Sequence, residues 1–243
     1  MQMISAAQMP DIHGDIEASL AKIIEHAVAA EKENAILICY PECFLQRYVV
    51  HKDLTRELAI DLSSPSFKNI LGQFSYINPV LVIGLIEIDK QRLFNTAVVI
   101  KNGQVLGKYR KTNLTTGEHK VFTAGDEFPV FEVDGIKFGI NICYDLNFPE
   151  CAANIAAQGA QLLVCPCNNM LRRDNAETWK FKHNEIRSRR TVETGLWLLS
   201  SDVTGTRDNR ISYGPTAVID PTGSVVSQLP LGQEGILFYP ALS

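Results

Sequence analysis

GIKFGIN (135–141) runs directly into ICYDLNFPE (142–150), which joins an apolar strand pattern to the start of a helix. Asn147 can cap that helix, and Pro149 suits its first turn. Cys143 therefore falls on a strand-to-helix turn, where a side chain points into solvent beside the backbone N–H groups of the turn. Such N–H groups can hold an oxyanion, so this position suits a nucleophile.

Strand and helix patterns alternate along the chain on both sides of this turn. Asn102-Gly103 predicts a tight hairpin, and Asp134-Gly135 predicts a second turn. Crossovers and hairpins together predict an α/β fold of mixed sheets, with two sheets packed face to face and helices outside each. The expected helices cover 14–33, 64–77, 148–158 and 175–194, and the expected strands cover 2–8, 35–40, 79–88, 92–100, 104–110, 129–133, 136–142, 161–166, 196–201, 216–220, 224–228 and 234–239.

Composition places the chain among ordinary globular proteins. It has 243 residues, of which 46% are hydrophobic and 21% charged, so residues 1–243 suit one large domain. The net charge of −4 argues against nucleic acid or an anionic membrane as a partner. Apolar runs such as PVLVIGLIEI (79–88) are about half of the roughly 20 residues that a membrane span needs. The N-terminus MQMISAAQMP lacks the pattern of a signal peptide, so we expect a cytoplasmic protein.

The cysteines are scattered through apolar segments and are not spaced like a disulfide framework, so we expect reduced thiols. Cys165 and Cys167 form the one tight pair, but no further Cys or His stands in register with them. We therefore expect no metal site. The positions are Cys39, Cys43, Cys143, Cys151, Cys165 and Cys167.

Three loops that follow expected strands each carry one reactive residue. Glu42 follows AILICYP, Lys111 follows VLGKYR, and Cys143 follows GIKFGIN. In layered α/β folds such loops build the active site. A free thiol has a pKa of about 8.5 and needs a base, a nearby carboxylate can move its proton, and a lysine can stabilise an oxyanion. Taken singly, each residue is more often a solvated loop side chain or a buried thiol, but their joint order favours a catalytic site.

Four segments carry a resemblance to the carbon–nitrogen hydrolase (nitrilase) superfamily, in its amidase-type branches. They resemble, in order, the segment of that family's catalytic Glu, its Lys segment, a Glu-bearing loop and its nucleophile segment. The resemblance covers nearly the whole chain and implies a four-layer α-β-β-α sandwich, usually dimerised, with no metal and no organic cofactor. The segments are PEC (41–43), YRKTNL (109–114), GEHKVFTAGDE (117–127) and ICYDLNFPE (142–150).

The resemblance also assigns roles to individual residues. It makes Glu42 the general base and acid, Lys111 the oxyanion stabiliser and Cys143 the nucleophile. It makes Glu118 a second carboxylate that orients Lys111 or the substrate, and the backbone N–H of Tyr144 a second oxyanion donor. The implied reaction passes through a thioester on the cysteine, which water then hydrolyses.

The chain departs from the family pattern near the expected pocket mouth. Asn147 stands where relatives commonly carry Arg, Arg47 replaces a small residue, and Thr115 follows Leu114 where a Pro is common. These departures bear on substrate identity rather than on the reaction. Suggested substrate contacts are Arg47, Tyr48, Asn168 and Asn169.

Two groups of charged residues have a structural interpretation. Asp145 suits a side chain that stabilises the turn at the helix start. Arg187, Arg189 and Arg190 could bind an acidic substrate, but ion pairs with Glu185 and Glu193 on the long helix are the favoured interpretation.

The leading functional hypothesis is hydrolysis of a small linear amide to an acid and ammonia. Nitrile hydrolysis ranks lower, because nitrilases of this superfamily tend to have Trp after the nucleophile and a longer C-terminal tail, whereas this chain has Tyr144. N-carbamoyl hydrolysis and a catalytically silent binding module of the same fold are two further hypotheses. The resemblance and the apolar segment ILFYPALS (236–243) also predict a homodimer or a higher homo-oligomer.

Overall fold

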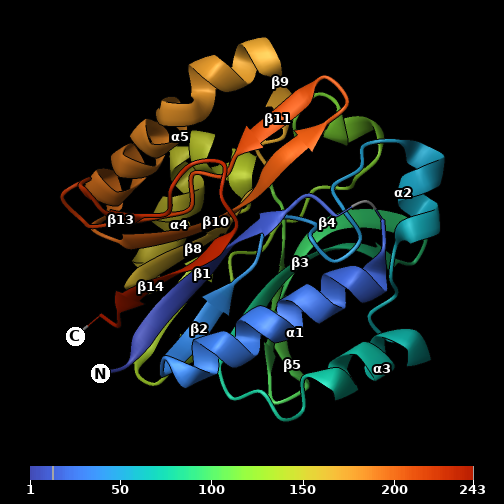
Figure 1. The fold of residues 1–243 in the computed structure, drawn as a ribbon, viewed down its shortest axis with the longest axis horizontal. Helices are drawn as coiled ribbons and strands as arrows, with labels where there is room; N and C mark the ends of the chain where they lie inside the picture. The colour runs from blue at the N-terminus through green and yellow to red at the C-terminus, as the bar shows by residue number, and fades with distance from the viewer. Residues whose placement is uncertain (13, 243) are drawn as a thin grey trace.

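The structure, a computed structural model, describes residues 1–12 and 14–242 (Figure 1). Its helices are α1 (Ile16–Lys32), α2 (Lys52–Leu58), α3 (Pro65–Gln73), α4 (Pro149–Ala157) and α5 (Arg173–Thr194). Its strands are β1 (Met3–Pro10), β2 (Ala35–Cys39), β3 (Val80–Asp89), β4 (Arg92–Lys101), β5 (Gln104–Arg110), β6 (Val130–Val133), β7 (Ile136–Ile140), β8 (Leu162–Pro166), β9 (Leu171–Arg172), β10 (Trp197–Arg207), β11 (Arg210–Tyr213), β12 (Ala217–Ile219), β13 (Val225–Gln228) and β14 (Gly235–Pro240).

The strands form two mixed layers that β10 joins. In one layer β1, β2 and β3 are parallel, β4 and β14 run antiparallel to them, and β5 pairs antiparallel with β4. In the other layer β7, β8 and β10 are parallel, β6 and β12 run antiparallel to them, and β13 pairs antiparallel with β12. The first half of β10 pairs with β8, and its second half, from Asp202, pairs with β1. The predicted pair of mixed sheets is therefore confirmed, and β10 fixes the position of one sheet relative to the other.

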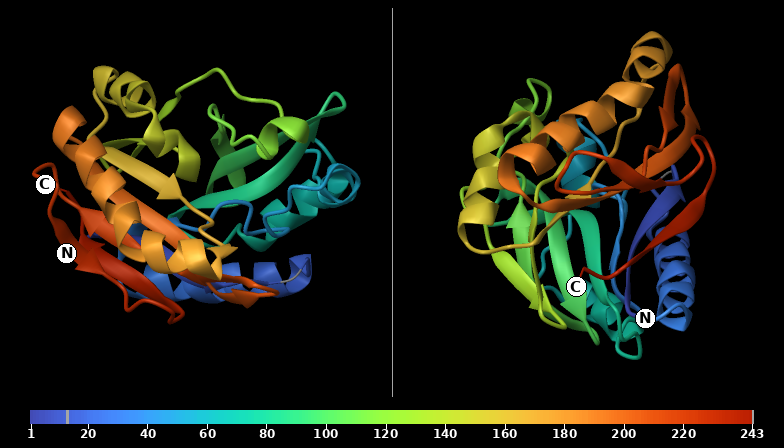
Figure 2. Two further views of the ribbon diagram at one scale, coloured as in Figure 1. Left: turned by 90° about the horizontal axis from the view of Figure 1, so that it is seen from above. Right: turned by 90° about the vertical axis from the view of Figure 1, so that its left-hand side faces the viewer.

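Apolar side chains alternate between the two faces of each sheet, which produces three packed layers of core. Figure 2 shows the strands between α4 and α5 on one side and α1 and α3 on the other. Between the sheets lie Ile4, Leu37, Val82, Phe138, Val164 and Leu199. Under α1 and α3 lie Leu20, Ile23, Ile38, Phe67 and Leu81, and under α4 and α5 lie Ala152, Ile155, Leu163, Leu198 and Ile186. The predicted α-β-β-α sandwich is thus confirmed.

The hairpin between β4 and β5 follows the prediction from its sequence. Asn102 and Gly103 have φ angles of 49° and 71°, the left-handed values that a two-residue hairpin of this type needs. The strands pair up to Lys101 and Gln104 on either side of the turn. Local turn chemistry therefore sets the register that delivers Lys111 to the end of β5.

Some predictions of local structure were wrong. Asn147 does not cap α4, because residues Cys143–Asn147 form a 3-10 turn and α4 begins at Pro149 after Phe148. Helix α2 and strands β9 and β11 were not predicted, and β10 extends beyond the expected 196–201. The segment 236–243 contributes most of β14, which pairs along β1 with one of its two edges.

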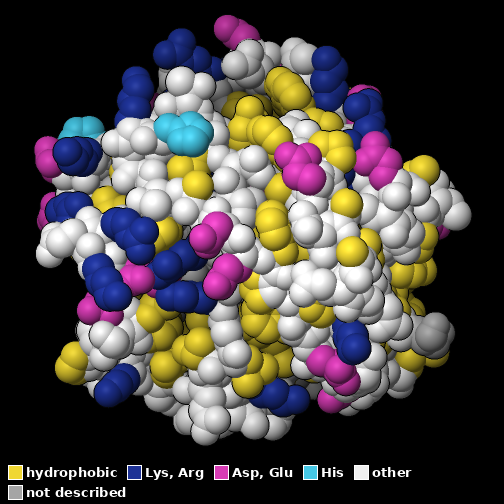
Figure 3. Space-filling model, turned by 180° about the vertical axis from the view of Figure 1, so that it is seen from behind, with side chains coloured by type: hydrophobic (Ala, Val, Ile, Leu, Met, Phe, Trp, Pro, Cys, Tyr) yellow, Lys and Arg dark blue, Asp and Glu magenta, His cyan; other side chains and the backbone are white. Residues whose placement is uncertain are grey.

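The surface carries mixed charge on the face shown in Figure 3, where Lys and Arg side chains lie among Asp and Glu side chains. In the part of the chain that the structure describes, no helix combines the length and the apolar character needed to cross a bilayer.

Candidate active site

The predicted reactive residues meet at the strand ends of the two facing sheets. Glu42 follows β2 and Lys111 follows β5 in one sheet, while Cys143 follows β7 in the other. All three line one cavity of about 330 Å³. The topology therefore brings together residues that are far apart in the sequence, as the strand-end argument predicts.

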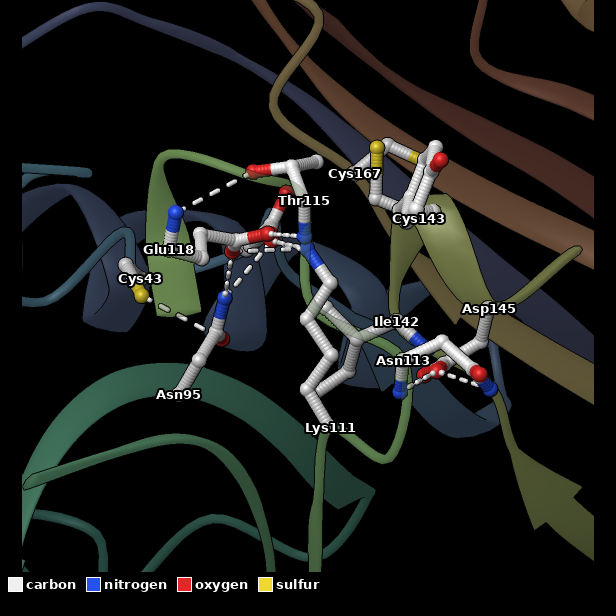
Figure 4. A network of polar contacts seen from close by, with 12 residues as sticks. Cys43, Asn95, Lys111, Asn113, Thr115, Glu118, Ile142, Cys143, Asp145 and Cys167 are labelled. Carbon is white, nitrogen blue, oxygen red and sulfur yellow. Dashed lines mark hydrogen bonds and ion pairs between the residues drawn. The ribbon is translucent and has the colours of Figure 1, made fainter. Parts of the chain in front are cut away.

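Lys111 is held between two buried carboxylates. Its Nζ lies 2.7 Å from Glu42 Oε1 and 2.8 Å from Glu118 Oε1. Asn95, from the middle of β4, donates through Nδ2 to the same two oxygens, at 2.7 Å for Glu42 and 3.2 Å for Glu118 (Figure 4). Glu118 Oε2 accepts from the backbone N–H of Thr115 at 2.9 Å. The lysine head group is thus fixed in one position by side chains that are themselves fixed.

The charges of this cluster do not cancel, because one ammonium serves two carboxylates. Burial raises the pKa of Glu42, and the negative charge of Glu118 adds to this effect against the opposing pull of Lys111. Burial also acts to raise the pKa of Glu118, but Lys111 and the hydrogen bonds from Thr115 outweigh it and hold that pKa below its usual range. Burial opposes the charge of Lys111, yet the two carboxylates keep its pKa well above normal. Glu42 is therefore the carboxylate better suited to accept and return a proton.

The backbone of the Glu42 loop packs against β3. Glu42 N–H donates to the carbonyl of Cys167 at 3.2 Å, which links the loop to the other sheet. Gly84 of β3 lies under the loop, since a Cβ at this position would come within 2.3 Å of the Pro41 carbonyl oxygen and 2.9 Å of Glu42 Cα. The position of the carboxylate therefore depends on the absence of a side chain in the adjacent strand.

Cys143 occupies the turn between β7 and α4 in a strained backbone conformation. Its φ angle is 44°, a left-handed value that is uncommon for a residue with a Cβ and often marks a functional position. Asp145 holds this turn, because its carboxylate accepts from the N–H of Ile142 at 2.9 Å, the N–H of Asn113 at 2.7 Å and the hydroxyl of Tyr109 at 2.8 Å. The prediction that Asp145 stabilises the turn is thus confirmed, and the same carboxylate ties the turn to the segment after Lys111.

The Cys143 thiol lies beside two residues that follow β8. Its Sγ is 3.7 Å from Asn169 Oδ1, and its side chain lies next to that of Cys167 (Figure 4). The neighbouring Cys167 thiol raises the pKa of Cys143 well above the usual thiol value, and burial and the charge of Glu42 add to this effect. The resting group is therefore a thiol, which needs a base before it can attack.

Of the other residues suggested from the sequence, all but Arg47 line the cavity. Tyr48, Asn168 and Asn169 line the cavity, and Tyr144 lines it next to the nucleophile. Arg47 is not among the described residues of the cavity wall, although it follows the Glu42 loop with a φ angle of 90°.

The wall that α5 and the β9–β11 pair supply was not predicted, although Arg187 on α5 was one of the residues weighed as a contact for an acidic substrate. The missed residues from α5 recur with helical spacing, which was the available signal. The wall residues are Met170, Leu171, Asn175, Trp179, His183, Ile186, Arg187 and Arg210.

Arg187 differs from its expected role on the α5 surface. It is buried, with Nη2 at 3.2 Å from Cys167 Sγ and 3.6 Å from Asp202 Oδ2, so the predicted ion pair with Glu185 is wrong for this residue. The ion pair predicted between the α5 arginines and Glu193 is present for Arg190, which is buried, at 2.8 Å.

Among residues 1–12 and 14–242, no group of three or more His, Cys, Asp or Glu side chains is placed to hold a metal ion.

Comparison with known families decides the classification. The carbon-nitrogen hydrolase family model matches residues 3–240. The chain belongs to the carbon–nitrogen hydrolase family. The resemblance carried by the four motifs is therefore confirmed, and so is its classification as a hydrolase of carbon–nitrogen bonds.

Relatives of this carbon–nitrogen hydrolase include proteins named as amidases and one named as a probable nitrilase. A probable nitrilase of Schizosaccharomyces pombe is 29% identical over 242 residues, covering 97% of this chain and 87% of the relative. An (R)-stereoselective amidase of a Pseudomonas species is 25% identical, covering 92% of this chain and 79% of the relative. The solved amidase of a Nesterenkonia species is 25% identical with a TM-score of 0.83, covering 98% of this chain and 89% of that one.

Proposed function

We propose that this carbon–nitrogen hydrolase cleaves a small linear amide to a carboxylic acid and ammonia, with Cys143 as nucleophile. The observation that carries the proposal is the shared cavity, in which a thiol on a strained turn faces a buried Glu42–Lys111 pair. A cysteine, a buried base and a fixed cation are together the components that acyl transfer requires.

In the first half of the reaction Glu42 takes the proton from the Cys143 thiol, and the thiolate attacks the amide carbonyl carbon. The negative charge that develops on the carbonyl oxygen is stabilised by Lys111 Nζ and by the backbone N–H of Tyr144. The carbon–nitrogen bond then breaks, Glu42 returns its proton to the leaving nitrogen, and ammonia departs. An acyl thioester remains on Cys143.

In the second half Glu42 takes a proton from water, which attacks the thioester carbonyl. The carbon–sulfur bond breaks, the acid product leaves, and the proton returns to the sulfur of Cys143. Glu118 does not touch the reacting atoms in this scheme. It holds Lys111 at 2.8 Å and, through its charge, raises the pKa of Glu42, which makes Glu42 the stronger base.

One feature of the wall supports amides that carry a carboxylate at their other end. Arg210 lines the cavity, and its Nη1 donates to the carbonyl of Met170 at 3.2 Å. No ion pair with a described carboxylate holds Arg210, so its guanidinium is available to a substrate carboxylate. An omega-amidase of Saccharomyces cerevisiae is among the relatives, at 26% identity over 93% of this chain and 80% of its own length. Nitriles and N-carbamoyl compounds are the alternative substrates for the same three residues.

The decisive experiment measures ammonia release over a panel of ω-amides, short aliphatic amides, nitriles and N-carbamoyl compounds. We expect turnover of amides by the wild type, and none by Cys143→Ala at an unchanged melting temperature. Cys151→Ala is the matched control, because Cys151 lies on α4 and is not among the described residues of the cavity wall. Activity of Cys143→Ala within about tenfold of wild type would contradict the proposed nucleophile, since loss of a nucleophile typically costs orders of magnitude.

A homodimer is part of the proposal. Its support is the surface of α5, where Phe181 is 65% and Val192 59% exposed, together with the apolar C-terminal segment, in which β14 pairs with β1 along one edge. Light scattering at micromolar concentration tests it, and a strictly monomeric mass would contradict it.

A further inference from the structure

A second thiol, that of Cys167, lies beside the nucleophile Cys143 at the equivalent position after the neighbouring strand. Strands β7 and β8 are parallel neighbours, and their last pair in register is Ile140 with Val164. Cys143 and Cys167 each lie three residues beyond that pair. Neighbouring strands lie about 4.8 Å apart, which is within the range of Cα separations that a disulfide spans. The two side chains lie next to each other, and both line the cavity (Figure 4).

The surroundings of Cys167 favour its participation in thiol chemistry. The guanidinium of Arg187 donates to its sulfur at 3.2 Å, and a cation in this position stabilises the thiolate that forms during reaction. Cys165 is the competing partner, since its sulfur lies 3.5 Å from that of Cys167. Cys165, however, packs among the apolar residues under α4 and α5 and is not among the described residues of the cavity wall. A small oxidant that enters the cavity therefore meets Cys143 and Cys167 first.

We propose that Cys143 and Cys167 form a site of reversible oxidation, at which a small hydroperoxide converts the two thiols to a disulfide. The consequence for activity rests on the proposed role of Cys143 as nucleophile, whereas the bond itself does not. Because the disulfide ties up the sulfur that attacks the amide, the enzyme is switched off, and a dithiol restores it. The cross-link also prevents further oxidation of Cys143 to sulfinic acid, which a dithiol cannot reverse.

The reaction balances in two steps. Glu42 takes the proton of Cys143, the thiolate attacks one oxygen of the hydroperoxide, and the O–O bond breaks. The product is a sulfenic acid on Cys143, and the departing alkoxide or hydroxide takes the proton from Glu42. The sulfur of Cys167 then attacks the sulfenic sulfur, so that an S–S bond forms and water leaves. The two thiols lose two electrons, and the O–O bond of the hydroperoxide accepts them.

The test treats the whole purified protein with hydrogen peroxide and maps its peptides under non-reducing conditions. We expect a linked peptide that joins Cys143 to Cys167, with an activity loss of about tenfold or more that dithiothreitol reverses. Cys167→Ala is expected to lose activity under peroxide as well, but without recovery and with two added oxygens on Cys143. Cys151→Ala, the matched control away from the pair, is expected to behave as wild type.

Cys165→Ala separates the two competing partners, because it removes the competing thiol and leaves the proposed pair. The proposal is overturned if wild type yields sulfinic acid on Cys143 without a linked peptide, or a link between Cys165 and Cys167 instead. Full recovery of peroxide-treated Cys167→Ala would overturn it too. Peptide mapping needs no turnover, so a linked peptide in a protein that cleaves no amide would refute the proposed function and leave the oxidation site standing.

Discussion

Replacing Lys111 with Met tests whether the buried cluster depends on its single positive charge. Lys111 is 2% exposed and is the cation for both Glu42 and Glu118, at 2.7 and 2.8 Å. Met has nearly the same length and fills the same apolar space, so the change removes the charge with little change of volume. Two carboxylates then face each other in a buried site, and at least one must take up a proton.

The size of the effect follows from the burial of the cluster. Removing one partner of a buried ion pair costs about 3–5 kcal/mol, because the charge left behind has lost its compensation. In a chain of this length 1 kcal/mol shifts the melting temperature by about 2–4 °C, so Lys111→Met should melt about 6–20 °C below wild type. Glu42→Gln should melt close to wild type, because Lys111 keeps Glu118 as its partner. Both variants should lack amidase activity.

Calorimetric melting and ammonia release, measured on the same preparations, provide the assay. Lys180→Met is the control, since it breaks an ion pair of the same 2.7 Å length on the exposed face of α5 and should melt like wild type. Combining Lys111→Met with Glu42→Gln should recover part of the lost stability, because only one carboxylate remains. The reasoning is refuted if Lys111→Met melts within about 2 °C of wild type, or if the double variant melts lower than Lys111→Met.

The remaining predictions concern the base, its loop and the cavity wall. Because burial raises the pKa of Glu42 and its carboxylate must be ionised to act, kcat/KM should fall as pH drops through a value above the ordinary 4.5. Glu118→Gln should move this acid limb to lower pH, since it removes a charge that raises the Glu42 pKa, and an unmoved limb would contradict that coupling. Normal turnover by Glu42→Gln beside an inactive Glu118→Gln would transfer the base role to Glu118. Gly84→Ala should lower kcat by about 10² or more, since its methyl group displaces the Glu42 backbone. Gly72→Ala in α3 is the control, because no atom lies within 4 Å of the new Cβ, and it should keep full activity. Equal kcat values for the two variants would contradict the close approach of Gly84 to the loop. Arg210→Met should raise KM for amides with a terminal carboxylate and leave KM for neutral amides unchanged. An equal rise of KM for both kinds of amide would exclude Arg210 as the carboxylate contact.

The part of the site that the sequence predicted is the part that follows strands. Glu42, Lys111 and Cys143 each end an apolar run, and a strand end in a layered fold is a restricted location. Asn95 was missed, although an Asn in the middle of the apolar strand LFNTAVV is a buried polar group that must find partners. It finds them in Glu42 and Glu118, which no local pattern in β4 specifies.

The secondary-structure elements that were not predicted are α2, β9 and β11, and each was missed for a reason of its own. Helix α2 has the sequence KDLTREL, which is too short to carry an apolar periodicity that could be recognised. Strands β9 and β11 exist because they pair with each other and with the extended end of β10. Strand β9 has only two residues and pairs with β11 far along the chain, so local propensity could not identify it. Strand β11 forms a tight hairpin with β10, in which Arg207 pairs with Arg210, and the turn residues Asp208 and Asn209 were the local signal that was missed. The cavity wall that β9 and β11 build with α5 was therefore missed together with them.

The two sheets supply different halves of the chemistry, so the contacts between them decide whether the site works. The base and the cation belong to one sheet, and the nucleophile belongs to the other. Three connections hold these halves in register: the crossing strand β10, the bond from Glu42 N–H to the Cys167 carbonyl at 3.2 Å, and the Asp145 carboxylate that joins Ile142 to Asn113. A misplacement of about 1 Å between reacting groups can cost about 10²-fold in rate. The polar connections between the sheets are directional, so they contribute to placing the proton donor beside its acceptor in a way that the apolar core does not.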